Sequence, residues 1–411
     1  MRAVLRIGMM RRLWYAQIIS VFGDFLALFA VISVLTFRLH ANPQQVTGVQ
    51  IAYLLPIALL GIMAGVFVDR WPLKPTMVSS DSLRAALVLL LLFATHLWQF
   101  YAVLAAISVV SSFFSPAQGV AIRHAVPLHG LRSANALMQQ VMFGMRIIGP
   151  AIAAFLVASF GPVSCYLVDS ASFVGSACLI ASVGFGPKET VISNERPQGA
   201  RGLGVQRIWS DMKQGISFIV HHAGLLFVIL ALAAAMFVIG CFGPLIAIYV
   251  RDSLHASTRV FGIASGLIGL GMLLGVNSLN AFAKGVRNAV LVYSGLAGIA
   301  VGLVFLYGIA HIWSTLLGNF VIGFSVAGIV IPSQTMIQQE TPPALMGRVG
   351  STVMSLVFGA QITGLVLSGL LAERIGVREV FAACAGMLVV LIVAGRVWMD
   401  PGHEVSASSA A

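Results

Sequence analysis

The sequence predicts an all-α integral membrane protein whose twelve transmembrane helices form two pseudo-symmetric six-helix bundles, and three observations support this prediction. Hydrophobic residues make up 59% of the 411 residues and charged residues only 9%, which is too little polar surface to cover a water-soluble globule. Apolar runs of about 20 residues, the length of a helix that crosses a bilayer, follow one another along the chain. The runs before and after one long polar segment also resemble each other, which indicates two similar halves.

Twelve apolar runs separated by short polar segments define the expected helices. Runs such as 85–94 and 387–394 are apolar at nearly every position, which indicates helices and not the alternating strands of a barrel. The first run follows a basic segment like that of a signal peptide, but no small-residue cleavage site follows it, so we expect a retained helix. The expected spans are residues 14–37, 46–68, 76–95, 99–121, 135–159, 162–185, 223–250, 260–282, 288–309, 312–335, 348–371 and 377–398.

The distribution of basic residues predicts the orientation. An even number of spans puts both termini on one side, where the loops hold 16 Lys and Arg residues against five in the opposite loops. Because positive loops stay in the cytoplasm, we expect both termini to be cytoplasmic and the protein to lie in a bacterial cytoplasmic membrane. The net charge of +11 is dispersed over many loops, so nucleic acid is not an expected partner.

The two halves are expected to be an N-terminal bundle (1–185) and a C-terminal bundle (223–399), joined by a cytoplasmic linker (186–222) and followed by a cytoplasmic tail (400–411). The stretch FGMRIIGPAIAAFLVASFG from Phe143 matches FGAQITGLVLSGLLAERIG from Phe358 at an offset of 215 residues. The same offset relates Pro127 to Pro342, so the sequence indicates an internal duplication.

Several stretches carry a family resemblance. Gly65, Asp69, Arg70 and Lys74, in the pattern GxxxDRxxxK between the second and third spans, resemble the signature loop of the major facilitator superfamily. SFFSPAQGVAIRHAVP from Ser112, LRSANAL from 131 and TPPALMGRV from 341 look like the macrolide-efflux and enterobactin-exporter-like branch of its drug:proton antiporters. This resemblance implies the two-bundle major facilitator fold and proton-coupled transport by alternating access.

The resemblance also implies a gate on the cytoplasmic side. Asp69 would brace the N-terminal end of the eleventh helix near Arg348, where the helix dipole stabilises a carboxylate, and would latch the halves together in one state. The alternative is that Arg70 and Lys74 only anchor the loop on the positive side. The expected gate residues are Gly65, Asp69, Arg70, Lys74, Asp81, Arg84 and Arg348.

Asp81 and Arg84 are spaced to meet on one face of the third helix. They would either extend the gate network or form a local ion pair at the surface.

Ionisable residues inside a bilayer are costly and therefore candidates for function. Asp24 and Arg146 lie at similar depths, roughly 15 Å along helices one and five at about 1.5 Å per residue. We expect them to pair, with Asp24 as the proton carrier; a static ion pair that fixes helix packing is the alternative. For Asp169 in the sixth helix we expect a structural hydrogen bond.

The fifth helix carries Gly144, Gly149 and Pro150 in a segment similar to the antiporter motif, although Ala153 and Ala154 replace glycines. The resemblance implies that this helix slides against the eighth, and ordinary close packing by small residues is the alternative.

Aromatic, methionine and amide side chains on the inner helices suit a bulky amphiphile better than a sugar or an inorganic ion. The candidate cavity residues are Gln17, Phe25, Phe113, Phe114, Gln139, Met142, Phe237, Phe242, Asn319, Phe324 and Gln361.

We therefore expect a monomeric secondary transporter that exports amphiphilic, macrolide-like small molecules in exchange for protons, surrounded by membrane lipid. A siderophore or lysophospholipid carrier of the same fold, or a passive channel or scramblase, remains an alternative. Without a P-loop, an HExxH or a GxSxG motif, neither an enzyme nor a cofactor or metal is expected. The four cysteines, Cys165, Cys178, Cys241 and Cys384, are expected to be buried free thiols.

Overall fold

The computed structural model describes residues 2–68, 71–127, 130–184, 217–282, 286–342 and 345–398. Within these ranges, twelve long helices match the twelve expected spans, and ten of them are apolar and long enough to cross a membrane. The all-helical membrane fold predicted from the sequence is confirmed. Several helices run past their apolar segments; α12, for example, continues to Glu340, because polar end turns remain helical beyond the apolar layer.

The first half comprises the short α1 (Arg2–Leu5), α2 (Gly8–Ser33) continued by the π-helical turn η1 (Val34–Arg38), α3 (Pro43–Val68), α4 (Leu73–Leu89) with the 3-10 turn η2 (Leu90–Phe93), α5 (Leu97–Ala125), α6 (Leu131–Phe160) and α7 (Pro162–Ala181). The second half comprises α9 (Ala223–Asp252), α10 (Thr258–Phe282), α11 (Asn288–Gly308), α12 (Ile312–Glu340), α13 (Met346–Ile375) and α14 (Val377–Trp398).

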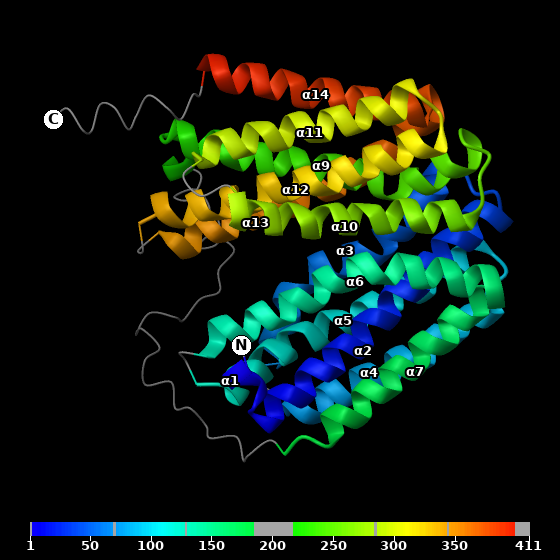
Figure 1. Ribbon diagram of the computed structural model, residues 1–411. Helices are drawn as coiled ribbons and strands as arrows, with labels where there is room; N and C mark the ends of the chain where they lie inside the picture. The colour runs from blue at the N-terminus through cyan, green and yellow to red at the C-terminus, as the bar shows by residue number, and fades with distance from the viewer. Residues whose placement is uncertain are drawn as a thin grey trace.

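The two halves form separate bundles that converge at one end and diverge at the other (Figure 1). The start of α2 and the end of α14 lie at the diverging end, which we call the N-terminal face; the opposite end is the distal face. Within the first half α2 and α4 pack on α7, and α3 packs on α5; within the second, α12 packs on α10 and α11. The halves meet where α3 crosses α13 and where α6 crosses α10. This arrangement leaves the space between the bundles open toward the N-terminal face.

The backbone repeats itself at the offset of 215 residues found in the sequence. His40 and His255 both have φ of 48°, and Gly161 and Gly376, which end α6 and α13, have φ of 80° and 96°. A left-handed residue after a helix favours glycine because glycine has no Cβ to clash. The two halves therefore share the same backbone conformation at these two pairs of equivalent turns.

The cysteine prediction is partly wrong. All four thiols are free, and Cys165, Cys241 and Cys384 are buried, but Cys178 is exposed. Cys178 lies on the outer face of α7, where an apolar side chain can face lipid as readily as a protein core.

Some expectations fall on residues or side chains that the structure does not describe. They concern Asp69 and Arg70 of the signature loop, most of the linker, the whole tail, and the side chains of Arg146, Gln139 and Arg348.

Candidate functional site

A buried ion pair lies at the centre of the first half. Arg84 and Asp81, one turn apart on α4, form a salt bridge with almost no exposed surface on either side chain. Ser176 of α7 donates a hydrogen bond to the other carboxylate oxygen of Asp81 at 2.6 Å. The pair expected from the sequence is present, but its surface alternative is wrong, because α5 and α7 cover this face of α4.

Two aromatic rings enclose the guanidinium of Arg84. The rings of Phe114 on α5 and Phe173 on α7 each lie with their centroids 4.4 Å from its Cζ atom. A cation between two ring faces is stabilised by both quadrupoles and is held in a fixed position. Its Nε atom is buried and has no hydrogen-bond partner among the described residues, so the cation retains one unused donor.

Two more carboxyl groups approach this pair from α2 and α7. A Cβ atom on Gly23 would lie 2.3 Å from Oδ1 of Asp169, so the glycine lets α2 and α7 touch at this depth. Asp24, the next residue, interacts electrostatically with Arg84, Asp81 and Asp169. We call Asp24, Asp81, Arg84 and Asp169 the N-half charge cluster.

The remaining contacts of the cluster are few. The Ser172 hydroxyl donates to the backbone carbonyl of Asp169 at 2.7 Å and to its carboxylate at 3.4 Å, the kind of hydrogen bond expected from the sequence. Tyr53 on α3 also lies within electrostatic range of Asp24. Buried carboxyl groups around a shared guanidinium can take up and release a proton, and doing so changes the forces between the helices that hold them.

The expected pairing of Asp24 with Arg146 stays a prediction, because the side chain of Arg146 lies outside the described residues. The cation that the structure does place near Asp24 is Arg84, which sequence reasoning had assigned to the gate. Gly23 directly before Asp24 was the one available signal for a close helix contact.

The distal face is closed by contacts between the two halves. Arg251 at the end of α9 donates to the backbone carbonyls of Thr36 at 2.8 Å and Ala41 at 2.9 Å, and its guanidinium is also held by Asp252. Asn42 reaches Glu373 of α13 at 3.3 Å. These contacts were missed from the sequence, which marked Arg251 only as a loop cation on that side.

Close helix crossings reinforce this closure. The rings of Phe29 on α2 and Phe261 on α10 are stacked with centroids 4.6 Å apart. At the next residue, a Cβ on Gly262 would lie 2.0 Å from the Cβ of Ala154 on α6. The fifth and eighth spans therefore meet as the resemblance implied, and Gly262 makes room for the alanine that replaces a motif glycine. Gly149 packs instead against Phe25 of α2.

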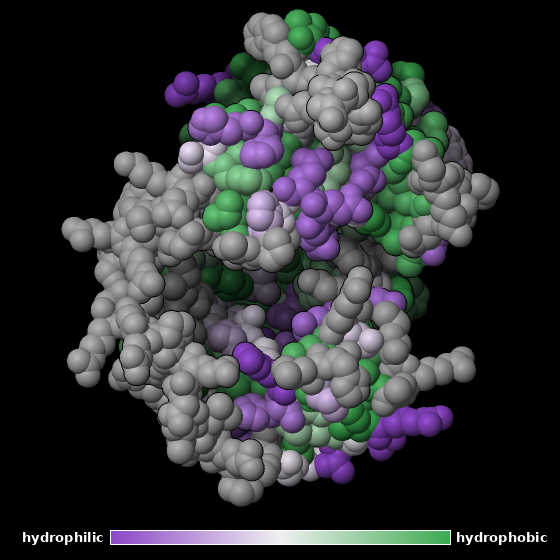
Figure 2. Space-filling view, turned by 90° about the vertical axis from the view of Figure 1, so that its left-hand side faces the viewer, coloured by the Kyte–Doolittle hydropathy of each residue, from purple (hydrophilic) through white to green (hydrophobic). Residues whose placement is uncertain are grey.

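The N-terminal face is open. Figure 2 looks at the molecule from this face and shows a deep hollow between the two halves, with hydrophilic side chains inside it. An opening on one face and a closure on the other is the geometry of one state of an alternating-access cycle.

Some of the candidate cavity residues lie where the inner helices meet. Gln118 on α5 donates to Gln17 on α2 at 2.6 Å, which joins two inner helices of the first half by a polar contact. Met142 on α6 is exposed. The backbone of Phe237 and of Gln361 lies against Gly364 and Gly240, where α9 and α13 cross closely.

Other candidates lie elsewhere. Phe114 packs on Arg84, Phe242 is buried against Phe381, and Asn319 is buried and donates to the backbone carbonyl of Ala264 at 3.0 Å. Phe113 and Phe324 line grooves between helices of a single half. A phenylalanine on an apolar helix gives no sequence signal for which of these environments it will occupy.

Two bundles of six helices with an opening between them on one face are the architecture of a membrane transporter. The chain matches the model of the Major Facilitator Superfamily over residues 13–360 and again over 228–410, and it belongs to that family. The family model and the relatives named below indicate a transporter.

Named relatives cover nearly the whole chain. The MFS-type transporter YfiS of Bacillus subtilis is 28% identical over 92% of this chain and 89% of its own length. Macrolide efflux protein A of Streptococcus pyogenes is 25% identical over 92% and 93%, and the multidrug efflux pump Tap of Mycolicibacterium fortuitum is 25% identical over 84% and 85%.

Solved structures share the fold. The nucleoside transporter NupG superimposes with a TM-score of 0.70 at 14% identity, covering 94% of this chain and 98% of that one. A bacterial homologue of the iron transporter ferroportin in an inward-facing state gives 0.66 at 17% identity, covering 95% and 98%. At these identities the likeness concerns the fold alone.

Proposed function

We propose that this protein exports amphiphilic small molecules from the bacterial cytoplasm in exchange for protons. Relatives named as macrolide and multidrug efflux proteins support the substrate class and the direction. The excess of Lys and Arg in the loops on the side of the termini supports a cytoplasmic N-terminal face. The described state is then the one that takes up substrate from the cytoplasm. The protein is proposed to act as a monomer.

Proton coupling is supported by a comparison of equivalent positions in the two halves, because the positions of the charge cluster hold charged residues in the first half alone. The offset of 215 residues relates Asp24, Asp81, Arg84 and Asp169 to Ile239, Leu296, Ile299 and Cys384. Of these counterparts, Leu296, Ile299 and Cys384 are buried, so the same template packs this place with apolar side chains. The same template can pack this place without charges, and ionisable residues buried inside a membrane are candidates for function.

The cluster offers a coupling mechanism. A proton on Asp24 removes its attraction for Arg84 and for Arg146, with which we still propose that it pairs. The change alters the forces between α2, α4 and α7 and favours one orientation of the halves over the other. On the cytoplasmic side, the latch of Gly65, Asp69, Arg70, Lys74 and Arg348 would form when the N-terminal face closes.

The test is transport by purified protein in proteoliposomes, with a panel of macrolides and other amphiphilic compounds and an imposed pH gradient. Wild-type protein should move substrate only when a proton gradient is imposed, and in the direction opposite to the flow of protons. Asp24→Asn should abolish the response to the gradient while the protein still binds substrate. Glu379→Gln is the matched control, since Glu379 is an exposed carboxylate in the first turn of α14, outside both the cluster and the distal contacts described above.

Two results would overturn the proposal. Gradient-driven transport that persists in Asp24→Asn would remove this residue from coupling, and wild-type flux that is equal with and without the gradient would indicate a passive channel or scramblase.

A further inference from the structure

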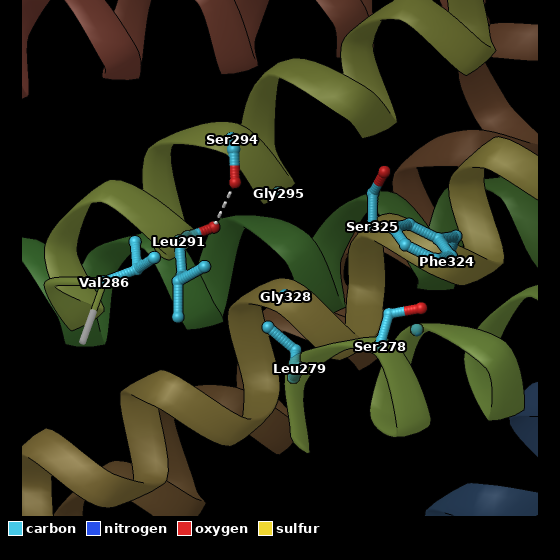
Figure 3. A pocket seen from close by; sticks show the side chains of 10 residues that line it. Ser278, Leu279, Val286, Leu291, Ser294, Gly295, Phe324, Ser325 and Gly328 are labelled. Carbon is cyan, nitrogen blue, oxygen red and sulfur yellow. Dashed lines mark hydrogen bonds between the residues drawn. The ribbon is translucent and has the colours of Figure 1, made fainter. Parts of the chain in front are cut away.

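Each half carries a groove at the same place in its fold. The C-half groove, of about 340 Å³, lies between α10, α11 and α12 (Figure 3), and the N-half groove, of about 550 Å³, lies between the start of α4 and α5. Seven lining residues of one groove are related to lining residues of the other by the offset of 215, among them Trp71 and Val286, Ser79 and Ser294, and Phe113 and Gly328. The duplication of the fold has therefore duplicated the groove.

The grooves share chemical detail as well as position. In the C-half groove the Ser294 hydroxyl donates to the carbonyl of Leu291 at 2.9 Å, as Figure 3 shows. In the N-half groove the Ser79 hydroxyl donates to the carbonyl of Thr76 at 3.2 Å, the equivalent bond. Both hydroxyls are thereby satisfied within their own helices, and the grooves present a mainly apolar lining.

The rims of both grooves are apolar. In Figure 1, α10, α11 and α12, whose residues line the C-half groove, lie side by side. Large apolar side chains are exposed at both rims, Val286 and Phe324 in one half and Trp71 and Leu83 in the other. Exposed apolar surface of this kind is stable in contact with acyl chains.

A basic residue is next in sequence to a lining residue of each groove, Lys74 beside Pro75 and Arg287 beside Val286, at the end nearest the N-terminal face. Helices α4 and α11 begin there; Lys74 lies in the first turn of α4, and Arg287 immediately precedes α11. Neither helix has an acidic residue in its first turn or a side chain that caps its N-terminus. The free backbone N–H groups of the first two residues of each helix, Leu73 and Lys74 in α4 and Asn288 and Ala289 in α11, favour an anion together with the basic side chain, and a phosphate fits both.

We propose that each groove binds one anionic phospholipid of the leaflet at the N-terminal face. An acyl chain would fill the groove, and the headgroup phosphate would lie at the helix N-terminus beside Lys74 or Arg287. A phospholipid carries both an acyl chain for the groove and a phosphate for the helix N-terminus, and it holds the two next to each other at the membrane interface.

Native mass spectrometry of the full-length protein in detergent with added dioleoyl-phosphatidylglycerol tests the proposal. Wild type should retain two lipids. Ser79→Phe and Ser294→Phe, at equivalent exposed positions that point into the grooves, should each retain one, and the double variant none. Ser82→Phe and Val301→Phe, exposed on the same helices but outside the grooves, should retain two. Thermal unfolding confirms that each variant is folded.

The headgroup is tested separately. Arg287→Gln and Lys74→Gln should each lower the preference of one site for phosphatidylglycerol over phosphatidylcholine by about fivefold, the effect of one basic residue near a charged headgroup.

Four results would overturn the proposal. They are two lipids retained by the double Phe variant, equal losses in the control variants, a lipid preference unchanged by both Gln substitutions, and displacement of both lipids by a macrolide, which would make the grooves substrate sites. Proton coupling is a separate matter, since Asp24→Asn should still retain two lipids.

Discussion

Arg84 is the residue on which the interior of the first half depends. It neutralises Asp81, fills the space between Phe114 and Phe173 and faces Asp24. Its planar guanidinium can stack on two rings and pair with a carboxylate at once, which a lysine ammonium cannot do.

Arg84→Ala should therefore destabilise the protein strongly. Removing one partner of a buried ion pair leaves the other charge uncompensated, which costs about 3 to 5 kcal/mol. We expect a lower midpoint of thermal unfolding in detergent, with Arg84→Lys between wild type and alanine. Arg259→Ala, which alters an exposed arginine in the first turn of α10, serves as control and should unfold as wild type does. An Arg84→Ala protein as stable as the control would contradict the prediction.

The sequence could predict the Asp81 and Arg84 pair because both residues lie on one helix, where spacing determines contact. It could not predict that Asp24 and Asp169 join them. That grouping depends on how three helices cross, and the crossing depends on a single glycine, Gly23, whose role becomes visible only when α7 is in place.

At the scale of helices, the crossing of α6 and α10 shows how small residues set the distance between the halves. Gly262 lies against Ala154 and against the backbone carbonyl of Pro150, which is 3.1 Å from the position of an added Cβ. A larger residue fits there only if the two helices separate.

Gly262→Leu should shift the protein away from the distal-closed state. The added side chain would overlap α6, and overpacking of this kind costs about 1 to 3 kcal/mol in the closed state alone. Distances between spin labels placed on the distal ends of α6 and α10 should lengthen. Ile263→Ala changes the neighbouring residue, whose side chain is exposed, and should leave the distances as they are. If both variants give wild-type distances, the crossing does not hold the closed state.

The helices themselves could be predicted almost completely, because apolar runs of bilayer length with polar ends are an unambiguous signal. Which side of each helix faces lipid and which side faces other helices could not be predicted. Membrane helices are apolar on the side that faces lipid and on the side that faces other helices, so no amphipathic pattern separates the two. Phe113 and Phe324 were assigned to the cavity for this reason, and they line the outer grooves.

At the scale of the molecule, the distal closure is an assembly of a few polar and aromatic contacts between rigid halves. Arg251 makes the most of them, because one guanidinium nitrogen bonds two carbonyls that belong to the other half.

Arg251→Ala should weaken the closure without unfolding either bundle. Each hydrogen bond from a charged group is worth about 1.5 to 3 kcal/mol, so the distal-open state should become more populated. A cysteine introduced at Ala41 should then react faster with a water-soluble thiol reagent. Arg378→Ala, which alters an arginine bonded within the second half, is the control. Equal reaction rates in the two variants would show that Arg251 is not the closing contact.

The acceptors of Arg251 carry a further consequence. Thr36 lies in the π-helical turn η1, and Ala41 lies in the loop that follows it. When the distal face opens, those carbonyl oxygens lose Arg251 as their hydrogen-bond donor. Water that enters the opening then supplies the new donors. The opening therefore takes up water, so osmolytes too large to enter it should favour the closed state in proportion to the osmotic pressure, and the transport rate should depend on the water activity on the side of the distal face.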